Sequence, residues 1–468
     1  MDLSTEDAWI PEAETIAALS TPAGEGGIGV IRISGTLAIE IALQLFRRAD
    51  GSALVSPASF RLYYGQIVNP ADGAVVDEVL LSVMRAPHSY TREDVVEISA
   101  HGGREPLRKI LKLLFRLGVT PAAAGEFTQR AYLNGRIDLT QAEAVMDTIR
   151  AHTDAGLRAA QTRLAGALGL QVRELRGRII CLLASIEAAI DFAEEDITFL
   201  TPEEIFTELT ALLAEVNKLT DSYTRGKLLR EGAVLALIGR TNTGKSSLLN
   251  ALLGEARAIV TDIPGTTRDV IEEGYDLGGI PVRLVDTAGI RHTHDVVEKI
   301  GVERSRESLA SADLILLVCD GNQALNDEDL HLLEQVQQRP HLLVVNKSDL
   351  PVVLTEEVLG AYDNAPVVSV SALTGAGLDQ LQLMLRQLLL GDDIIIATPA
   401  LATERQHDAA RRSAEALERT LATLNEGGTE ELLAVDLREA ATALGEITGD
   451  DTGEEVIAEI FSRFCVGK

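Results

Sequence analysis

The spacing of hydrophobic residues divides the chain into an N-terminal region of mixed structure and longer regions with a helical pattern. In roughly the first 135 residues, short apolar runs predict strands such as Ile28–Ser34, and helices over 37–48 and 105–117. Over 138–225 and again over 403–464, apolar residues recur every three or four positions, as on one face of an amphipathic helix. A Thr140 and Glu143 pair has the spacing of a capping box at the start of the first helical stretch.

The helical pattern is interrupted by a segment in which apolar strands alternate with helices. Four such runs, each followed by polar or glycine residues, are typical of parallel strands in an α/β domain: 233–238, 282–285, 341–345 and 367–370. We therefore expect a multidomain α/β plus α protein with four segments: an α/β domain (1–135), a first helical part (136–228), an inserted α/β domain (229–389) and a second helical part (390–468). The two helical parts are expected to form one discontinuous domain, and two unrelated helical domains are the alternative.

Composition narrows the class of protein. The 468 residues have a net charge of −29, with 46% hydrophobic and only 4% aromatic residues. No apolar stretch reaches the about 18–20 residues that cross a bilayer, and the N-terminus lacks the basic segment of a secretory signal. The three cysteines do not suggest a disulfide scaffold, and Cys181 and Cys319 lie in apolar runs and are expected to be core residues. We therefore expect a cytoplasmic protein with no membrane association. The negative charge argues against non-specific nucleic-acid binding.

A phosphate-binding loop follows the first strand of the inserted segment. Gly239 to Ser246 reads Gly-Arg-Thr-Asn-Thr-Gly-Lys-Ser between an apolar run and a helix start, which is the context that such a loop requires. Backbone N–H groups at the helix N-terminus bind phosphate oxygens, Lys245 adds a full positive charge, and the Ser246 hydroxyl can coordinate Mg²⁺. The candidate phosphate ligands here are Asn242, Thr243, Gly244, Lys245, Ser246 and Ser247.

The nucleotide base is indicated by motifs further along the chain. The Asp349 carboxylate in Asn346-Lys347-Ser348-Asp349 can accept from N1–H and the 2-amino group of guanine, a donor pair that adenine lacks. Ser371-Ala372-Leu373 would bring a backbone N–H to the guanine O6. Asp286-Thr287-Ala288-Gly289 would supply a carboxylate behind Mg²⁺ and a Gly N–H for the γ-phosphate. Four motifs in this order, each after a strand, predict a GTP site.

Two features concern how GTP would be hydrolysed. Ile290 occupies the position where many small GTPases have the glutamine that orients water, so another group such as Asp295 or Glu298 must act instead. In the 261–269 segment, Thr267 is the expected second Mg²⁺ ligand and Thr266 a further nucleotide ligand. We also expect a K⁺ site that would neutralise transition-state charge, with these ligands: Asn242, Thr261, Ile263 and Thr266. The resulting hypothesis is K⁺-stimulated hydrolysis.

Together these residues resemble the MnmE (TrmE) tRNA-modification GTPases from Thr15 to Lys468. The most specific match is the ending Phe464-Cys-Val-Gly-Lys468. Further family-like stretches are 26–35, 101–103, 125–131, 139–144, 229–232 and 262–269. The departures are small: Thr241 and Thr243 replace a Pro and an Ala in the phosphate loop, and Arg136 replaces a common Lys.

The resemblance implies a tetrahydrofolate-binding N-terminal domain that dimerises, a discontinuous helical domain and an inserted Ras-like GTPase. It implies that Glu298 positions water, and it assigns Cys465 near the folate, either as a reactive residue or as a buried residue of the last helix. It implies these folate contacts: Arg32, Glu97, Arg136 and Lys468. The cofactor would be 5,10-methylene- or 5-formyl-tetrahydrofolate.

The implied activity is modification of tRNA with a partner flavoprotein. With MnmG, which carries FAD, the homodimer would form a heterotetramer that adds a (carboxymethyl)aminomethyl group to C5 of wobble uridine 34. The alternative is a ribosome-assembly GTPase of the Era/Der type. That class usually carries a basic KH-type domain with a GXXG loop, whereas the C-terminal part here has an acidic, helical pattern.

Overall fold

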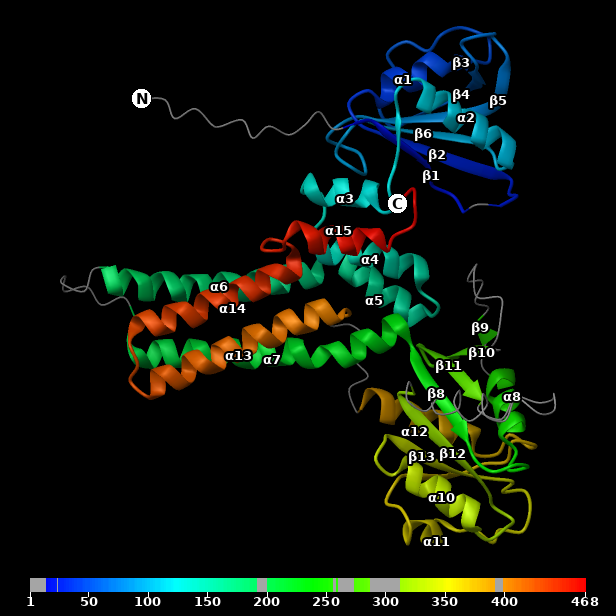
Figure 1. Ribbon diagram of the computed structural model, residues 1–468, viewed down its shortest axis with the longest axis vertical. Coiled ribbons are helices and arrows are strands. Elements are labelled where there is room, and N and C mark those ends of the chain that lie inside the picture. Colours follow the sequence, from blue (N-terminus) through cyan, green and yellow to red (C-terminus); the bar gives the residue numbers. More distant parts are fainter. Residues whose placement is uncertain are drawn as a thin grey trace. The chain divides into compact units, whose positions relative to one another are not determined.

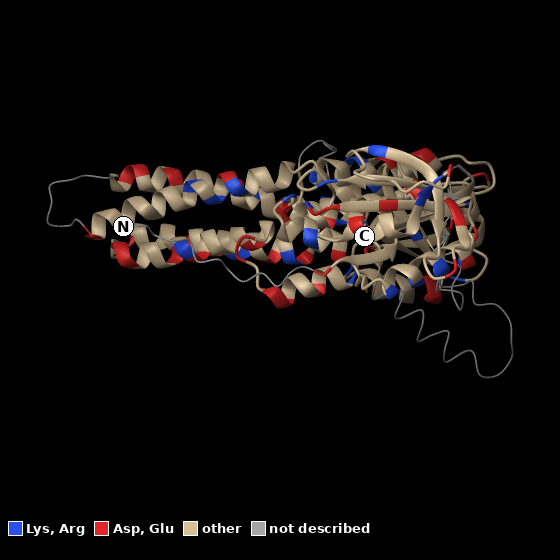
Figure 2. Cartoon of the chain, turned by 90° about the horizontal axis from the view of Figure 1, so that it is seen from above, with Lys and Arg blue, Asp and Glu red and all other residues tan. Residues whose placement is uncertain are grey.

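The computed structural model describes residues 14–22, 24–191, 200–255, 258–259, 273–286, 312–391 and 399–468 (Figure 1). The chain forms two compact units: unit 1 is Met1–Met146 with Gly445–Lys468, and unit 2 is Asp147–Leu444. Acidic residues are spread over helices and strands, with basic residues between them (Figure 2). Within the described ranges, every helix is too short or too polar to cross a membrane.

Unit 1 contains a seven-stranded sheet in the order β3-β4-β5-β6-β2-β1-β7. Neighbouring strands are antiparallel, except that β1 and β7 are parallel. The strands are β1 (Ile16–Leu19), β2 (Ile28–Ser34), β3 (Phe46–Arg48), β4 (Arg61–Val68), β5 (Val75–Met84), β6 (Val95–His101) and β7 (Thr120–Pro121).

Two helices, α1 (Ala38–Leu45) and α2 (Arg104–Arg116), pack with one face of this sheet and bury its apolar residues. Because side chains alternate along a strand, Ile31 and Ile33 are buried in this core while Arg32 points to the other face. Arg32 lies directly opposite Glu97 in the β2–β6 register. The sheet therefore brings two of the predicted folate residues together.

The helix predicted over 37–48 is shorter than the sequence pattern indicates. It ends at Leu45, and Phe46–Arg48 instead forms β3, paired with β4. Phe46 is fully buried and lies opposite Ile67, so sheet pairing and burial outweigh the helical periodicity at this point.

The C-terminal residues of the chain pack within unit 1. Helix α15 (Glu454–Ser462) lies against α3 (Glu126–Leu133), and Phe461 and Phe464 share a buried cluster with Leu139 and Met146 of α4 (Leu139–Arg150). The capping box expected at Thr140 and Glu143 is wrong, because α4 begins at Leu139. Asp138 and Gln141 cap it instead, through two reciprocal 3.0 Å backbone–side-chain bonds.

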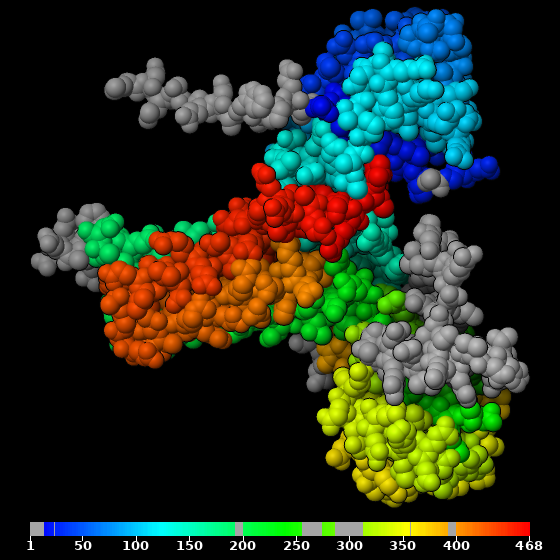
Figure 3. Space-filling view, viewed as in Figure 1, coloured from blue at the N-terminus to red at the C-terminus, as the bar shows by residue number. Residues whose placement is uncertain are grey.

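Long helices from both sides of the inserted segment pack together in unit 2. They are α5 (Asp154–Leu164), α6 (Ala167–Asp191), α7 (Pro202–Glu231), α13 (Glu404–Asn425) and α14 (Glu430–Thr448), whose last turn belongs to unit 1. Helix α13 packs along α7, and α14 lies along α6 (Figure 3), where Arg176 donates to the Ala441 carbonyl at 3.2 Å. A capping box between Thr201 and Glu204 starts α7. This packing favours one discontinuous helical domain over two unrelated ones.

The inserted segment forms a second seven-stranded sheet, in the order β14-β13-β12-β8-β11-β10-β9. The five strands from β14 to β11 are parallel, and β10 and β9 are antiparallel neighbours. The strands are β8 (Ala233–Ile238), β9 (Ala258–Ile259), β10 (Glu273–Leu277), β11 (Ile280–Asp286), β12 (Leu314–Asp320), β13 (His341–Asn346) and β14 (Val367–Ser369). Its helices include α8 (Lys245–Glu255), α10 (Asp327–Val336), α11 (Glu356–Gly360) and α12 (Leu378–Leu390).

Candidate functional site

The predicted phosphate loop joins the end of β8 to the start of α8, so it lies at the carboxyl edge of a parallel sheet. Both glycines of the loop are required because neighbouring atoms lie too close to leave room for a side chain. A Cβ on Gly239 would lie 2.3 Å from the Val318 carbonyl oxygen, and one on Gly244 would lie 2.2 Å from Nδ2 of Asn346. Both also have positive φ values, +149° and +91°, which favour glycine.

Lys245 is buried at the first residue of α8, beneath the loop. Its ammonium donates to the carbonyl oxygens of Gly239 (2.6 Å) and Arg240 (2.7 Å). The buried Thr243 hydroxyl donates to the same Arg240 carbonyl at 3.1 Å. The loop therefore holds a positive charge at a helix N-terminus, which is the electrostatic arrangement that a phosphate group needs.

Asn346 connects three of the predicted motifs. Its Nδ2 donates to the Thr243 carbonyl at 2.8 Å, and its Oδ1 accepts from the Ala372 backbone at 3.1 Å. A buried amide that satisfies both of its polar atoms in this way fixes the phosphate loop against the two base-recognition loops. The distant motifs thus converge at one edge of the sheet.

The two charged residues of the Asn-Lys-Ser-Asp motif point to different parts of this site. Lys347 donates to the Asn242 carbonyl (2.8 Å) and to Asp320 (2.7 Å). Asp349 is exposed, and one oxygen accepts from the Ser371 hydroxyl at 2.5 Å, which orients the carboxylate. An oriented, exposed carboxylate is the arrangement expected for an acceptor of guanine N–H groups.

The structure accounts for only part of the predicted nucleotide site. Asn242, Ser246, Ser247 and Leu373 are exposed around it. Asp286 ends β11, but its side chain lies outside the described residues. The following predicted site residues lie wholly outside the described residues: Thr261, Ile263, Thr266, Thr267, Thr287, Ala288, Gly289 and Glu298.

Two further residues support the phosphate loop and were not predicted. Arg240 donates to Gln323 at 2.6 Å and lies 3.5 Å from the buried Asp329 carboxylate. Asp320 accepts from Gln323, from Lys347 and from the Asn322 backbone. A polar residue at the carboxyl end of a buried strand was the available sequence signal for Asp320. Arg240 offered no such signal, because its partners lie more than 80 residues away along the chain.

A second candidate site lies in unit 1 around the Arg32–Glu97 pair. Nε and Nη2 of Arg32 contact the same oxygen of Glu97, Oε1, at 2.9 and 2.8 Å. Among the described residues, no donor contacts Oε2 of Glu97. The Arg32 guanidinium lies 5.2 Å from the Tyr90 ring centroid and 5.6 Å from that of Phe127. Tyr90 and Phe127 were missed because their proximity depends on tertiary packing.

The other two predicted folate residues reach this cluster through the same aromatic residues. The Arg136 guanidinium lies 4.7 Å from the Tyr90 centroid and donates to the Tyr90 carbonyl at 2.9 Å. The Phe127 N–H donates to the main-chain oxygen of Lys468 at 3.2 Å. The structure therefore brings all four residues to one region of unit 1.

The C-terminal residues are seated closely on this region. The Gly125 N–H donates to the Cys465 carbonyl at 3.3 Å, and the Ser20 hydroxyl donates to the Gly467 carbonyl at 3.0 Å. Gly467 has φ +91°, and a Cβ there would lie 2.2 Å from the Leu19 carbonyl oxygen. Cys465 is exposed, so the structure does not place its side chain in the core.

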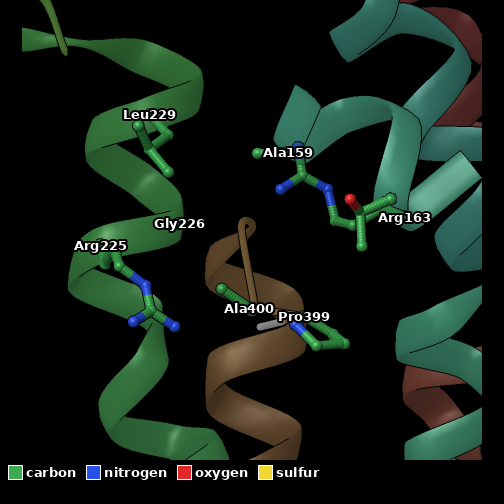
Figure 4. Close-up of a pocket in the computed structure, with 8 residues that line it drawn as sticks. Ala159, Arg163, Arg225, Gly226, Leu229, Pro399 and Ala400 are labelled. Atoms are coloured by element: carbon green, nitrogen blue, oxygen red, sulfur yellow. The ribbon is translucent and has the colours of Figure 1, made fainter. Parts of the chain in front are cut away.

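A small pocket between α5 and α7 is separate from both sites (Figure 4). Its lining includes Arg163, Arg225, Gly226 and Ala400, and its volume of about 10 Å³ is enough for a single water molecule. The Arg163 guanidinium on this lining is already paired with the buried Asp147 at 2.8 Å. The pocket is too small for a nucleotide or a folate.

Comparison with known proteins identifies the domains. A family profile described as the MnmE helical domain matches residues 139–465. A second profile, described as the GTP-binding protein TrmE N-terminus, matches residues 15–136. Together they include most of the chain, and over the residues that they match they agree with the sequence resemblance.

Known relatives extend over nearly the whole length. The tRNA modification GTPase MnmE of Heliobacterium modesticaldum is 47% identical over 463 residues, covering 97% of this chain and 99% of the relative. That of Geobacillus thermodenitrificans is 46% identical, covering 98% and 100%. Among solved structures, Aquifex aeolicus Era bound to GDP and AlF₄⁻ is 26% identical over 39% of this chain and 66% of its own, with a TM-score of only 0.27. On the sequence relatives and family profiles, the chain belongs to the MnmE (TrmE) family of tRNA modification GTPases.

Proposed function

We propose that this GTPase acts with the flavoprotein MnmG to add a (carboxymethyl)aminomethyl group to C5 of wobble uridine 34 in tRNA. The one-carbon unit would come from 5,10-methylene- or 5-formyl-tetrahydrofolate. The observation that carries the proposal is the convergence in unit 1 of Arg32, Glu97, Arg136 and Lys468 with the C-terminal Cys-Val-Gly-Lys ending. This folate region belongs to the same chain as a complete set of guanine-nucleotide motifs.

The residues of the unit 1 site suit a folate by their chemistry. Oε2 of Glu97 is available to accept from the 2-amino and N3–H groups of a pterin, and Arg32 holds the carboxylate in place. Tyr90 and Phe127 provide aromatic surface beside this pair, and Arg136 and Lys468 provide positive charge for the glutamate end. The bound folate would supply the one-carbon unit, and Cys465 is a candidate reactive thiol beside it.

GTP hydrolysis would drive a conformational change and would take no direct part in the uridine chemistry. Lys245 would bind the phosphates, and Ser246 and Thr267 would hold Mg²⁺, which neutralises developing charge on the phosphate oxygens. Asn242 with the 261–266 segment would hold K⁺, and Glu298 would orient water because Ile290 cannot. The exposed position of Asn242 within the loop supports its part in this arrangement.

The partners we propose are those of the pathway. A homodimer would bind MnmG, which carries FAD, in a heterotetramer, and this complex would act on tRNA in the cytoplasm. Because the chain has a net charge of −29, tRNA must contact local basic patches or the MnmG subunit.

Folate binding tests the proposal. We expect Glu97→Gln to weaken binding of 5-formyl-tetrahydrofolate by about 10- to 100-fold, because a hydrogen bond to a charged group contributes about 1.5–3 kcal/mol. The control is Glu105→Gln, which changes an exposed carboxylate of α2 that pairs with Arg108, and it should bind normally. Absence of folate binding by the unmodified chain would contradict the proposal and would favour the Era/Der-type alternative.

The K⁺ requirement has its own test. We expect faster GTP hydrolysis in KCl than in NaCl at equal ionic strength, because Na⁺ would be too small to contact the phosphates and the Asn242 amide together. Equal rates in the two salts would exclude this part of the proposal and would leave the folate part intact.

A further inference from the structure

The loops that carry Tyr90 and Arg136 are joined by three side-chain bonds that run in both directions. Arg92 donates to the Asn134 carbonyl at 2.7 Å, and Asn134 Nδ2 donates to the Thr91 carbonyl at 2.6 Å. Arg136 donates back to the Tyr90 carbonyl at 2.9 Å. The two arginines, one on each loop, are therefore held beside the same pair of segments, 90–92 and 134–136.

Arg92 is held there at some conformational cost. Its φ is +60°, in the left-handed region that residues other than glycine rarely adopt. Such backbone strain persists only where surrounding contacts enforce it, and it is concentrated at functional positions. Here the enforcing contacts are the bonds between the two loops. They direct an exposed guanidinium to a defined place.

Neither arginine is neutralised by a carboxylate of the described part of the chain. Within the described ranges, no carboxylate forms an ion pair with Arg92 or Arg136, although the chain has 71 acidic and only 42 basic residues. Neighbouring Arg32 and Arg130 are both paired with glutamates. Each of these guanidinium groups donates one N–H to a backbone carbonyl and keeps further donors for an anion.

The site has a more buried end at Arg32 and Glu97 and an exposed end at the two arginines, and this order indicates which anion the arginines would bind. Arg32 and Glu97 are 18% and 28% exposed, whereas Arg92 and Arg136 are exposed, and Arg136 contacts the same Tyr90 ring as Arg32. A folate has an uncharged pterin head and a glutamate tail. Cells extend this tail with γ-linked glutamates, and each addition contributes one more carboxylate. A head bound at Glu97 would place the tail toward the two arginines.

We propose that Arg92 and Arg136 form a binding site for the carboxylates of a γ-linked polyglutamate tail. This inference rests on the proposed folate site and adds two things: a role for Arg92, and a preference for polyglutamylated over monoglutamylated folate. Because both guanidinium groups are already fixed by backbone contacts, they lose less conformational freedom on binding than unrestrained surface arginines would.

The test compares mono- and pentaglutamyl 5-formyl-tetrahydrofolate by calorimetry with the full chain. Two exposed ion pairs of ordinary strength predict about tenfold tighter binding of the pentaglutamyl form at low salt, decreasing as salt rises. Arg92→Gln should remove most of this preference and leave monoglutamyl affinity within about twofold. Arg116→Gln, which removes an exposed arginine from α2 in the same unit, should retain the preference.

Equal affinity of the unmodified chain for the two folates would overturn the inference. If Arg92→Gln weakened tRNA binding but kept the preference for the pentaglutamyl folate, the inference would also be overturned and the arginines would be assigned to phosphate. If Arg92→Gln is unstable, Arg92→Lys retains the charge and should retain the preference; loss of preference in a folded Arg92→Lys would contradict the inference. No binding of the monoglutamyl form by the unmodified chain would instead contradict the proposed folate function.

Discussion

The Thr153 hydroxyl donates a 2.7 Å hydrogen bond to the carbonyl oxygen of Gly279, and it also accepts the N–H of Gly156 at 3.1 Å. One buried side chain thus caps the N-terminus of α5 and fixes the turn between β10 and β11. Gly279 has φ +106°, and a Cβ there would lie 2.7 Å from that of Ala155. Because β11 leads directly to Asp286, this contact connects the helices to the nucleotide-binding domain.

Replacing Thr153 with valine should destabilise unit 2 by about 1–3 kcal/mol. The valine has nearly the same shape, but it leaves the helix cap and the Gly279 carbonyl without their partner. Denaturant unfolding monitored by circular dichroism would measure the change. Thr153→Ser keeps the hydroxyl and should recover most of the lost stability; equal losses in both variants would show that the hydroxyl bonds do not account for the loss.

The buried Asp147 carboxylate makes a second set of contacts that connects helices within unit 2. It accepts from Arg163 at 2.8 Å and from Arg230, in the last turn of α7, at 2.7 Å. Its side chain is 6% exposed and that of Arg163 is 4% exposed. Asp147→Asn should therefore cost about 3–5 kcal/mol, because it leaves a buried guanidinium without a counter-charge.

An exposed ion pair provides the control for this change. Asp408 pairs with Arg411 on the surface of α13, where both side chains are almost half exposed, so Asp408→Asn should cost less than about 1 kcal/mol. A similar loss in the two variants would mean that burial does not determine the value of the Asp147 pair.

Gly244→Ala should abolish tight GTP binding without unfolding the chain. The added Cβ would lie 2.2 Å from the Asn346 amide, and the φ of +91° is unfavourable for alanine, so the phosphate loop and the base loops must separate. A fluorescent GTP analogue would report at least about a tenfold loss, given a cost of 1.4 kcal/mol or more.

Gly254→Ala is the matched control for that loss. Gly254 lies in α8, where an added Cβ meets nothing within 4 Å and alanine is favoured by about 1 kcal/mol. GTP affinity should be unchanged and the melting temperature should rise slightly. Normal affinity in Gly244→Ala would show that the loop tolerates the displacement.

The three cysteines should react differently with alkylating reagents. Burial raises the pKa of the Cys319 thiol to about 12, so the reactive thiolate is scarce near pH 8 as well as inaccessible. Cys181 and Cys465 are exposed, so the expectation that Cys181 is a core residue is wrong, whereas that for Cys319 is confirmed. Mass spectrometry of the native chain should show two labelled cysteines, with a third only after unfolding. Labelling of native Cys319 at the rate of the other two would contradict its burial in β12.

The sequence predicted those features that depend on local pattern. Strand β2 and the region of α13 follow from hydrophobic periodicity, and the phosphate loop follows from residues that are adjacent in the chain. Features that depend on distant contacts were missed. Phe46 became a strand residue because it pairs with β4, and Tyr90 joins Arg32 to Arg136 only after three separate segments pack together.

The most direct test of the central claim is nucleoside analysis of tRNA by mass spectrometry. The host would be a bacterial strain that lacks its own MnmE and is complemented either with this chain or with an empty vector. We predict that the chain restores the C5-aminomethyl-type wobble uridines, and that the folate-site variant Glu97→Gln restores them poorly. Unchanged tRNA together with accumulated ribosomal RNA precursors, despite a folded and GTP-binding chain, would contradict the account.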